Sequence, residues 1–178
     1  MNSAYTIDVA LACPEWTEAC PTAETLARGA ADLAVARGTT ALRLAWKGAV
    51  ELGIILTDAA DQRQLNHKYR GVDQPTNVLA FPLWEPGTLP PPGAPVLLGD
   101  VVLALETTMQ EALQQNKLLA DHLRHLTVHG VLHLLGYDHQ VEAEAVIMES
   151  LERSILAELG VPDPYRDTMS LTEPAAIQ

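Results

Sequence analysis

The sequence predicts a small α+β domain, in which a mixed four- to five-stranded sheet is packed with about five helices and a metal site lies at the end of one helix. Three observations support this class. Short apolar segments with strand character alternate with segments of helical periodicity. One of the former, residues 96–105, is apolar almost throughout, as expected of a central strand. Three histidines cluster within residues 129–139, where a helical segment meets a glycine.

The N-terminal part predicts strands around one helix. Residues 22–37 keep helical spacing, and Gly38 is expected to close that helix. The last two of the expected strands are too close together for a helix between them, so a hairpin turning near Gly48 is predicted. These strands are residues 5–11, 41–48 and 50–57.

The middle of the chain predicts one helix, one short strand and a loop before the central strand. Asp58 is expected to cap a helix over residues 59–70. Residues 77–84 are apolar and are stopped by Pro82. The prolines and glycines of residues 85–95 forbid regular structure, so this segment is expected to be a loop.

The C-terminal half is predicted to be helical, over residues 106–117, 118–135 and 141–160. In the last of these helices the glutamates are expected to form a solvated face, because they lie largely off the apolar stripe. This stripe comprises Val141, Ile147 or Met148, Leu151, Ile155 and Leu159.

Length and composition are those of an ordinary globular protein. The 178 residues, 48% of them hydrophobic, fit one domain over residues 1–165, followed by a loosely ordered tail over residues 166–178. No stretch approaches the roughly 18 unbroken apolar residues of a membrane span, and the N-terminus lacks the basic start of a signal peptide. A cytoplasmic protein is therefore expected, in which Cys13 and Cys20, which match no zinc or thioredoxin spacing, stay reduced.

The charge distribution argues against general affinity for nucleic acid but leaves room for a local contact. The formal net charge is −12, which repels phosphate backbones over most of the surface. Nevertheless, Arg63, Lys68 and Arg70 lie within eight residues of one another. A local basic strip on an acidic protein is therefore possible.

The segment "HGVLHLLGYDH" carries the strongest chemical signal. His129 and His133 stand one turn apart on one face of a helix, so two imidazoles can bind one ion. Gly136 can take the left-handed conformation that ends a helix, which lets His139 swing back as the third ligand. Three histidines leave the fourth position of a tetrahedral site to water, as in catalytic zinc sites.

We therefore expect one zinc ion per chain, although ligand type alone leaves nickel, copper or iron open. Nearby polar residues have less certain roles. His122 and His125 lie on the same helical side, as donors behind the ligands or as ordinary surface residues. Asp138 either holds the ring N–H of a ligand or shapes the turn.

Gly130 separates this motif from the otherwise similar zinc frame of the metzincin proteases, which carries a general-base glutamate there. A glycine inside a helix costs roughly 1 kcal/mol relative to alanine. One explanation for it is the close approach of an adjacent strand or of the substrate. Without a carboxylate beside the metal, neutral imidazoles and a nearby arginine suit an anion better than a peptide.

Four segments carry a resemblance to a known family: "HLTVHGVLHLLGYDH" (125–139), "LNHKYRGVDQPTNVLAFP" (65–82), "LLGDVVLALE" (97–106) and "LAELGVPDPY" (156–165). Together they resemble the YbeY family of bacterial endoribonucleases. The resemblance spans most of residues 40–165, with Ala80 and Ala104 standing where the family commonly has serine.

The resemblance implies a zinc-dependent single-strand endoribonuclease that matures ribosomal RNA, notably the 3′ end of the small-subunit RNA, and supports ribosome quality control. Its partners would be single-stranded or ribosomal RNA and the ribosome or small-subunit proteins. It also implies that Arg70 is needed for catalysis, and a planar, always charged guanidinium can hold a phosphate bidentately. An ion pair between Arg70 and Asp73 is the structural alternative. Two other functions stay open: a ribosome-assembly binding module with a mainly structural metal, and a metal hydrolase of another substrate.

Overall fold

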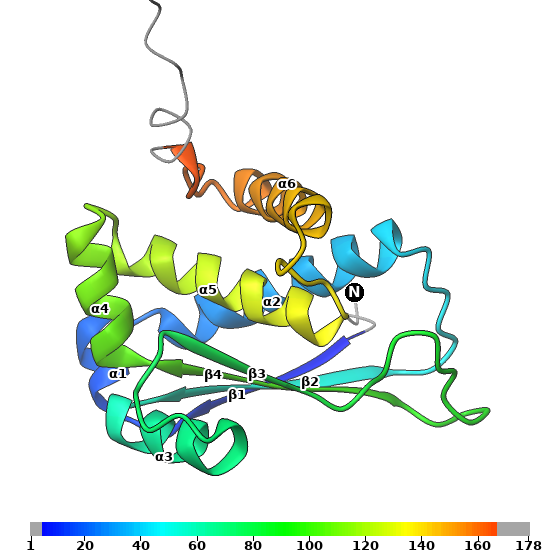
Figure 1. Cartoon of the computed structure of the whole chain (residues 1–178), viewed down its shortest axis with the longest axis horizontal. Coiled ribbons are helices and arrows are strands. Elements are labelled where there is room, and N and C mark those ends of the chain that lie inside the picture. The colour runs from blue at the N-terminus through cyan, green and yellow to red at the C-terminus, as the bar shows by residue number, and fades with distance from the viewer. Residues whose placement is uncertain (1–4, 167–178) are drawn as a thin grey trace, which may run out of the picture.

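The structure is a computed structural model that describes residues 5–166. Within this range the chain forms six helices and a four-stranded sheet (Figure 1), which confirms the predicted α+β class. In chain order the elements are β1 (Tyr5–Leu11), α1 (Glu15–Ala19), α2 (Ala23–Ala41), β2 (Val50–Thr57), α3 (Ala59–Arg70), β3 (Val78–Pro82), β4 (Val96–Ala104), α4 (Leu105–Gln114), α5 (Leu119–Leu134) and α6 (Glu142–Glu158).

The sheet is mixed, with the strand order β1-β2-β4-β3. Strand β2 is parallel to both β1 and β4, whereas β3 is antiparallel to β4. The expected central position of β4 is confirmed, since β4 lies between β2 and β3. Parallel neighbours need a crossover connection, and α2 supplies it between β1 and β2.

The predicted hairpin at Gly48 is wrong, and so is the helix end at Gly38. Helix α2 continues to Ala41, and residues 42–49 contain no strand. A Cβ atom at Gly38 would lie 2.4 Å from Leu135 Cδ1, so this glycine serves the close approach of α2 to α5. The chain leaves the helix at Arg43, which has a φ of 55°.

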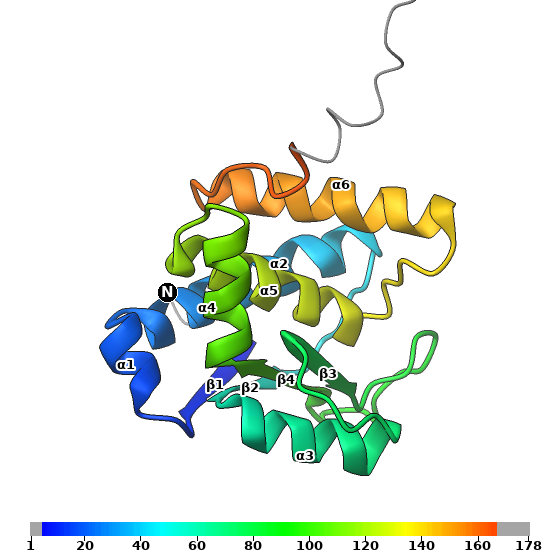
Figure 2. The same cartoon turned by 60° about the vertical axis from the view of Figure 1, so that its left-hand side comes forward.

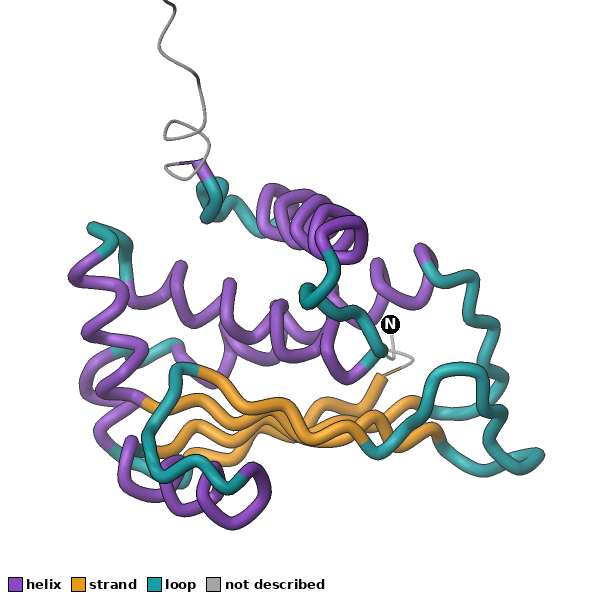
Figure 3. Tube along the Cα trace, viewed as in Figure 1, coloured by secondary structure: helices purple, strands orange, loops and turns teal. Residues whose placement is uncertain are grey.

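The helices are distributed unequally over the two faces of the sheet. Helices α2 and α5 lie along one face with α6 outside them, while α3 lies against the other face (Figures 1 and 2). The tube view shows the strands as a single layer between these helices (Figure 3). Asp58 caps α3 as expected, because its side chain accepts a hydrogen bond from the Asp61 backbone N–H at 2.8 Å.

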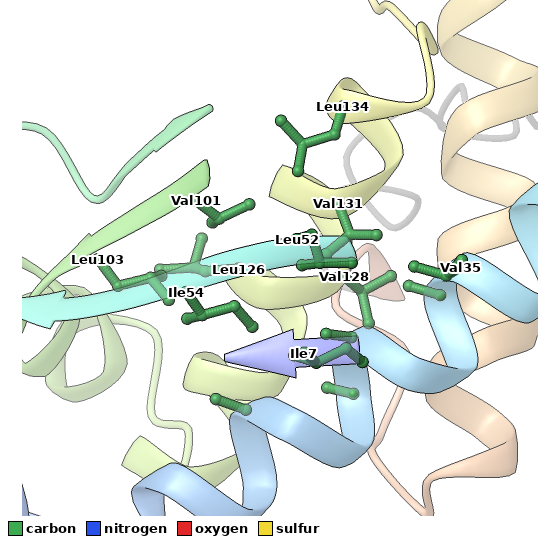
Figure 4. Packing of buried hydrophobic residues seen from close by; sticks show 14 of the residues in the cluster. Ile7, Val35, Leu52, Ile54, Val101, Leu103, Leu126, Val128, Val131 and Leu134 are labelled. Carbon is green, nitrogen blue, oxygen red and sulfur yellow. The ribbon is translucent and has the colours of Figure 1, made fainter. Parts of the chain in front are cut away.

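The main core fills the space between the sheet and helices α2 and α5. Alternate residues of β2 point into it, as the twofold repeat of a strand requires. Figure 4 shows these side chains meeting residues of α5, including Val128 and Val131. This packing holds α5 against the sheet, so residues on the other side of α5 have a fixed support.

The apolar face of α6 agrees with the predicted stripe except at its start. Met148 and Ile155 are buried, so Met148 belongs to the stripe and Ile147, which is 60% exposed, does not; Val141 is 58% exposed. Glu152 lies on this buried face and is 0% exposed, so the prediction of a solvated glutamate face is wrong at that residue. Cys13 and Cys20 are free and buried.

Two further expectations concern the loosely ordered C-terminal tail and the absence of a membrane span. The predicted loose tail falls almost entirely on residues 167–178, which lie outside the described residues. Between residues 5 and 166, none of the helices combines the length and the apolar composition that crossing a membrane requires.

Candidate metal centre

The C-terminal half of α5 carries the first two histidines of the site. His129 and His133 stand one turn apart, and their Nε2 atoms approach to 3.1 Å. The apolar residues between and around them pack into the core, and Leu132 and Leu134 are 0% exposed. The two imidazoles therefore project from one side of α5, while the other side of this helix is packed into the core.

The turn after α5 brings the third histidine to the other two. Gly136 has a φ of +90°, which favours glycine, and the Tyr137 N–H donates to the Leu132 carbonyl at 3.1 Å. The Asp138 carboxylate then accepts the His139 N–H at 2.7 Å. Of the two roles open to Asp138, this contact supports the shaping of the turn.

The three histidines can hold one ion. One ring nitrogen from each of His129, His133 and His139 lies within 4.8 Å of the others. Ligand nitrogens of a tetrahedral zinc site are roughly 3.4 Å apart, from a Zn–N bond of about 2.1 Å, so small ring rotations are enough to meet an ion. The donor set thus fits the expected zinc ion, with one coordination position left open.

The protonation state of His133 favours metal binding. Burial, together with smaller contributions from the neighbouring His129 and His139, lowers its pKa from 6.5 to about 4. Only a neutral imidazole has a free lone pair for a metal. At neutral pH this ring is therefore ready to bind an ion without first losing a proton.

Glu152 of α6 is the residue of this site that the sequence reasoning missed. Its Oε1 accepts a hydrogen bond from His129 Nδ1 at 2.5 Å, and its Oε2 accepts one from the Tyr165 hydroxyl. Burial acts to raise the pKa of Glu152, but contacts with His125, His129 and Tyr165 hold that pKa at about 2. The carboxylate is therefore ionised although it is fully buried.

The other two histidines of α5 lie farther along the same helix. His122 is buried, and its Nε2 is 2.7 Å from Glu111 Oε2. His125 Nε2 lies 3.9 Å from Glu152 Oε2. Neither is an ordinary exposed residue, and His125 contributes to the surroundings of the carboxylate that contacts His129.

A cleft of about 550 Å³ opens beside the three histidines. Arg70, at the end of α3, lines this cleft, and its Nη2 lies 3.4 Å from the Ala80 carbonyl oxygen. The alternative ion pair of Arg70 with Asp73 is wrong, because Arg63 holds Asp73 at 2.8 and 3.0 Å. The structure therefore brings the candidate catalytic arginine to the candidate metal site.

The close packing of α5 against the sheet explains why residue 130 is a glycine. A Cβ atom at this position would lie 2.6 Å from Val101 Cγ1 and 3.2 Å from Val78 Cγ2. Of the two reasons considered for this glycine, the close approach of a strand is the one the structure supports. A glutamate could not occupy this position without displacing α5 from the sheet.

An α+β fold that brings three histidines together beside a cleft lined by Arg70 has the arrangement expected of a metal-dependent hydrolase. The family model described as Endoribonuclease YbeY matches residues 23–160. The chain belongs to this family of nuclease hydrolases, which confirms the resemblance seen in the sequence.

Individual relatives agree with this assignment. An Endoribonuclease YbeY of Paramagnetospirillum magneticum is 53% identical over 166 residues, covering 93% of this chain and 98% of the relative. One from Rhodopseudomonas palustris strain BisA53 is 56% identical over 117 residues, covering 66% and 68%. A solution structure from Thermotoga maritima has the same fold, with a TM-score of 0.52 and 21% identity over 97% of this chain and 100% of the other.

Proposed function

We propose that the protein is a zinc-dependent, single-strand endoribonuclease of the cytoplasm. It matures ribosomal RNA, notably the 3′ end of the small-subunit RNA, supports ribosome quality control, and works with the ribosome or small-subunit proteins. One domain, residues 1–165, carries this activity. The proposal depends above all on one observation: Arg70 and the three histidines line the same cleft.

The residues of the cleft divide the chemistry between them. His129, His133 and His139 would hold one zinc ion per chain. A bound zinc ion supplies a Lewis acid for the phosphoryl group and makes water a better nucleophile at neutral pH. Arg70 would bind a non-bridging phosphate oxygen pair through its planar guanidinium and stabilise the charge that develops there.

The charge of the protein limits which RNA the cleft accepts. With a net charge of −12 the surface as a whole repels RNA, and Arg63 is already neutralised by Asp73. Attraction is therefore local to the cleft, where Arg70 offers a cation that no carboxylate pairs in the described residues. A short, unpaired segment suits this arrangement better than a long duplex.

Metal analysis of freshly purified protein, alongside cleavage of a fragment from the 3′ end of small-subunit ribosomal RNA, tests the proposal. We expect one zinc ion per chain and cleavage within single-stranded segments that stops after chelation. Cleavage that continues without metal would refute the assignment. If chelation unfolds the protein, the metal is mainly structural and the protein fits a ribosome-assembly binding module instead.

A further inference from the structure

A fully buried carboxylate behind the metal centre is the feature that the proposed chemistry does not use. Glu152 is 0% exposed, and both of its oxygens accept hydrogen bonds, from His129 Nδ1 and from the Tyr165 hydroxyl. Burial of an unpaired carboxylate costs several kcal/mol, so a charge in this position is tolerated only with such partners. Glu152 lies on α6, and its partners come from two other parts of the chain, α5 and the segment after α6.

We propose that Glu152 is a positioning residue for the metal centre, which fixes the tautomer and the ring orientation of His129, and that Tyr165 holds the Glu152 carboxylate in place. The proposal rests on the proposed function only in that the three histidines bind a zinc ion. It does not depend on which substrate is cleaved.

The hydrogen bond determines which nitrogen of His129 meets the ion. When Nδ1 donates its proton to Glu152 at 2.5 Å, the lone pair of a neutral ring is left on Nε2. That same Nε2 lies 3.1 Å from His133 Nε2, inside the three-histidine group. The carboxylate therefore orients the ring and also increases its basicity as a ligand.

Glu152 is not placed to take a proton from a substrate. Its side chain does not line the cleft that contains Arg70, and its 0% exposure closes it to solvent. Both oxygens are occupied by hydrogen-bond donors. Its effect on chemistry must pass through His129, which is what distinguishes a positioning residue from a catalytic one.

Tyr165 connects the end of the described chain to the same carboxylate. Its hydroxyl donates to Glu152 Oε2, and its ring stacks edge-on to His125, with centroids 5.7 Å apart. The Arg153 guanidinium lies over the Tyr165 ring, 5.1 Å from its centre. The segment after α6 is thus fixed against the metal centre, and removal of the hydroxyl should loosen Glu152 without changing any charge.

The experiment compares Glu152→Gln, Glu152→Ala and Tyr165→Phe with Glu144→Gln as the matched control. Glu144 lies on the same helix and has the same charge, but it is exposed. Zinc affinity is measured by competition with a chromophoric chelator, and the His129 tautomer by ¹⁵N NMR of the metal-free protein.

We expect Glu152→Ala to weaken zinc binding by about 10- to 100-fold, the usual effect of removing such a partner. Glu152→Gln keeps an acceptor oxygen but loses the charge, so its loss should be smaller, and that of Tyr165→Phe smaller still. Glu144→Gln should bind zinc as the unaltered protein does. The NMR spectrum should place the His129 proton on Nδ1, and Glu152→Ala should shift the population toward the Nε2-protonated ring.

The outcomes separate this proposal from the proposed function. Unchanged zinc affinity in Glu152→Gln and Glu152→Ala, or a proton on His129 Nε2 in the unaltered protein, overturns the positioning role. If Glu152→Ala fails to fold, the affinity and the NMR spectrum of Glu152→Gln decide the question. A chain that binds no zinc overturns both proposals, whereas tight zinc binding without RNA cleavage contradicts only the proposed function.

Discussion

The contact between α5 and the sheet at Gly130 allows a quantitative test of the structure. In Gly130→Ala the added Cβ would lie 2.6 and 3.1 Å from the two methyl carbons of Val101, and 3.2 Å from a methyl of Val78. Real Cβ atoms essentially never approach a neighbour as closely as 2.6 Å. Val101 is 0% exposed on an interior strand, and a β-branched side chain has few other rotamers. The backbone of α5 must therefore move.

Two opposing effects determine how much Gly130→Ala changes the free energy of unfolding. Overpacking a core by one methyl group costs about 1–3 kcal/mol, whereas replacing glycine by alanine inside a helix gains about 1 kcal/mol. The difference is a loss of about 0–2 kcal/mol in the free energy of unfolding, and the rigid neighbour places the expected value near 1 kcal/mol. Zinc affinity should fall as well, because Gly130 lies between the two ligands of α5.

Urea unfolding of the chelated protein measures this loss, and Gly29→Ala is its matched control. Gly29 also lies in a helix, but a Cβ there would meet nothing within 4 Å. Gly29→Ala should therefore stabilise the protein by up to about 1 kcal/mol. Combining Gly130→Ala with Val101→Ala should recover part of the loss, giving a favourable coupling energy. Equal stabilisation by Gly130→Ala and Gly29→Ala would refute the close contact.

Three further predictions concern the site. Arg70→Ala should keep its zinc content and melting temperature but lose about 100- to 1000-fold in RNA cleavage rate. Arg70→Lys should restore little of this rate, because lysine lacks the planar guanidinium that binds two phosphate oxygens. A wild-type rate in Arg70→Ala would remove Arg70 from the mechanism. Chelation should abolish cleavage while circular dichroism still reports a folded chain, whereas loss of the helical signal would indicate a structural metal. In the metal-free protein, the pKa of His133 is about 4 when folded and 6.5 when unfolded, so between these two pH values the unfolded state binds more protons. The free energy of unfolding should therefore fall as the pH drops from 6.5 to 4. In urea unfolding, His133→Asn should show a flatter dependence of this free energy on pH, and an unchanged dependence would contradict this account.

The elements that the sequence predicted well are those in which the local pattern and the tertiary environment agree. Strand β4 was predicted to be central because nearly all of its residues are apolar, and in the structure it lies between β2 and β3. The three histidines could be assigned to one metal site from the sequence because all the relevant residues lie within eleven positions. Two of the histidines are four residues apart on one helix, and a glycine ends that helix before the third. Such short-range geometry is determined without knowledge of distant segments.

The glycines show where local rules fail. Gly38 was expected to end a helix, but it lies inside α2, where it allows Leu135 to approach. Gly136, by contrast, has the positive φ of a helix end, as predicted. Both positions look alike in sequence, because a glycine that admits a neighbour and a glycine that adopts a left-handed conformation carry the same letter. Only the packing partner, far away in the chain, distinguishes them.

Glu152 was hidden for a related reason, although the sequence held a partial signal. A helix rich in glutamate is ordinarily solvated on that face, yet Glu152 stands four residues after Met148 and three before Ile155, on the side that is buried. Its partner His129 is 23 residues away on another helix, so spacing within α6 could not reveal the pair. Metal-bound histidines, however, usually need an acceptor for their second nitrogen. In a chain with a histidine metal motif, a glutamate on the apolar face of a neighbouring helix is therefore the first candidate for that acceptor.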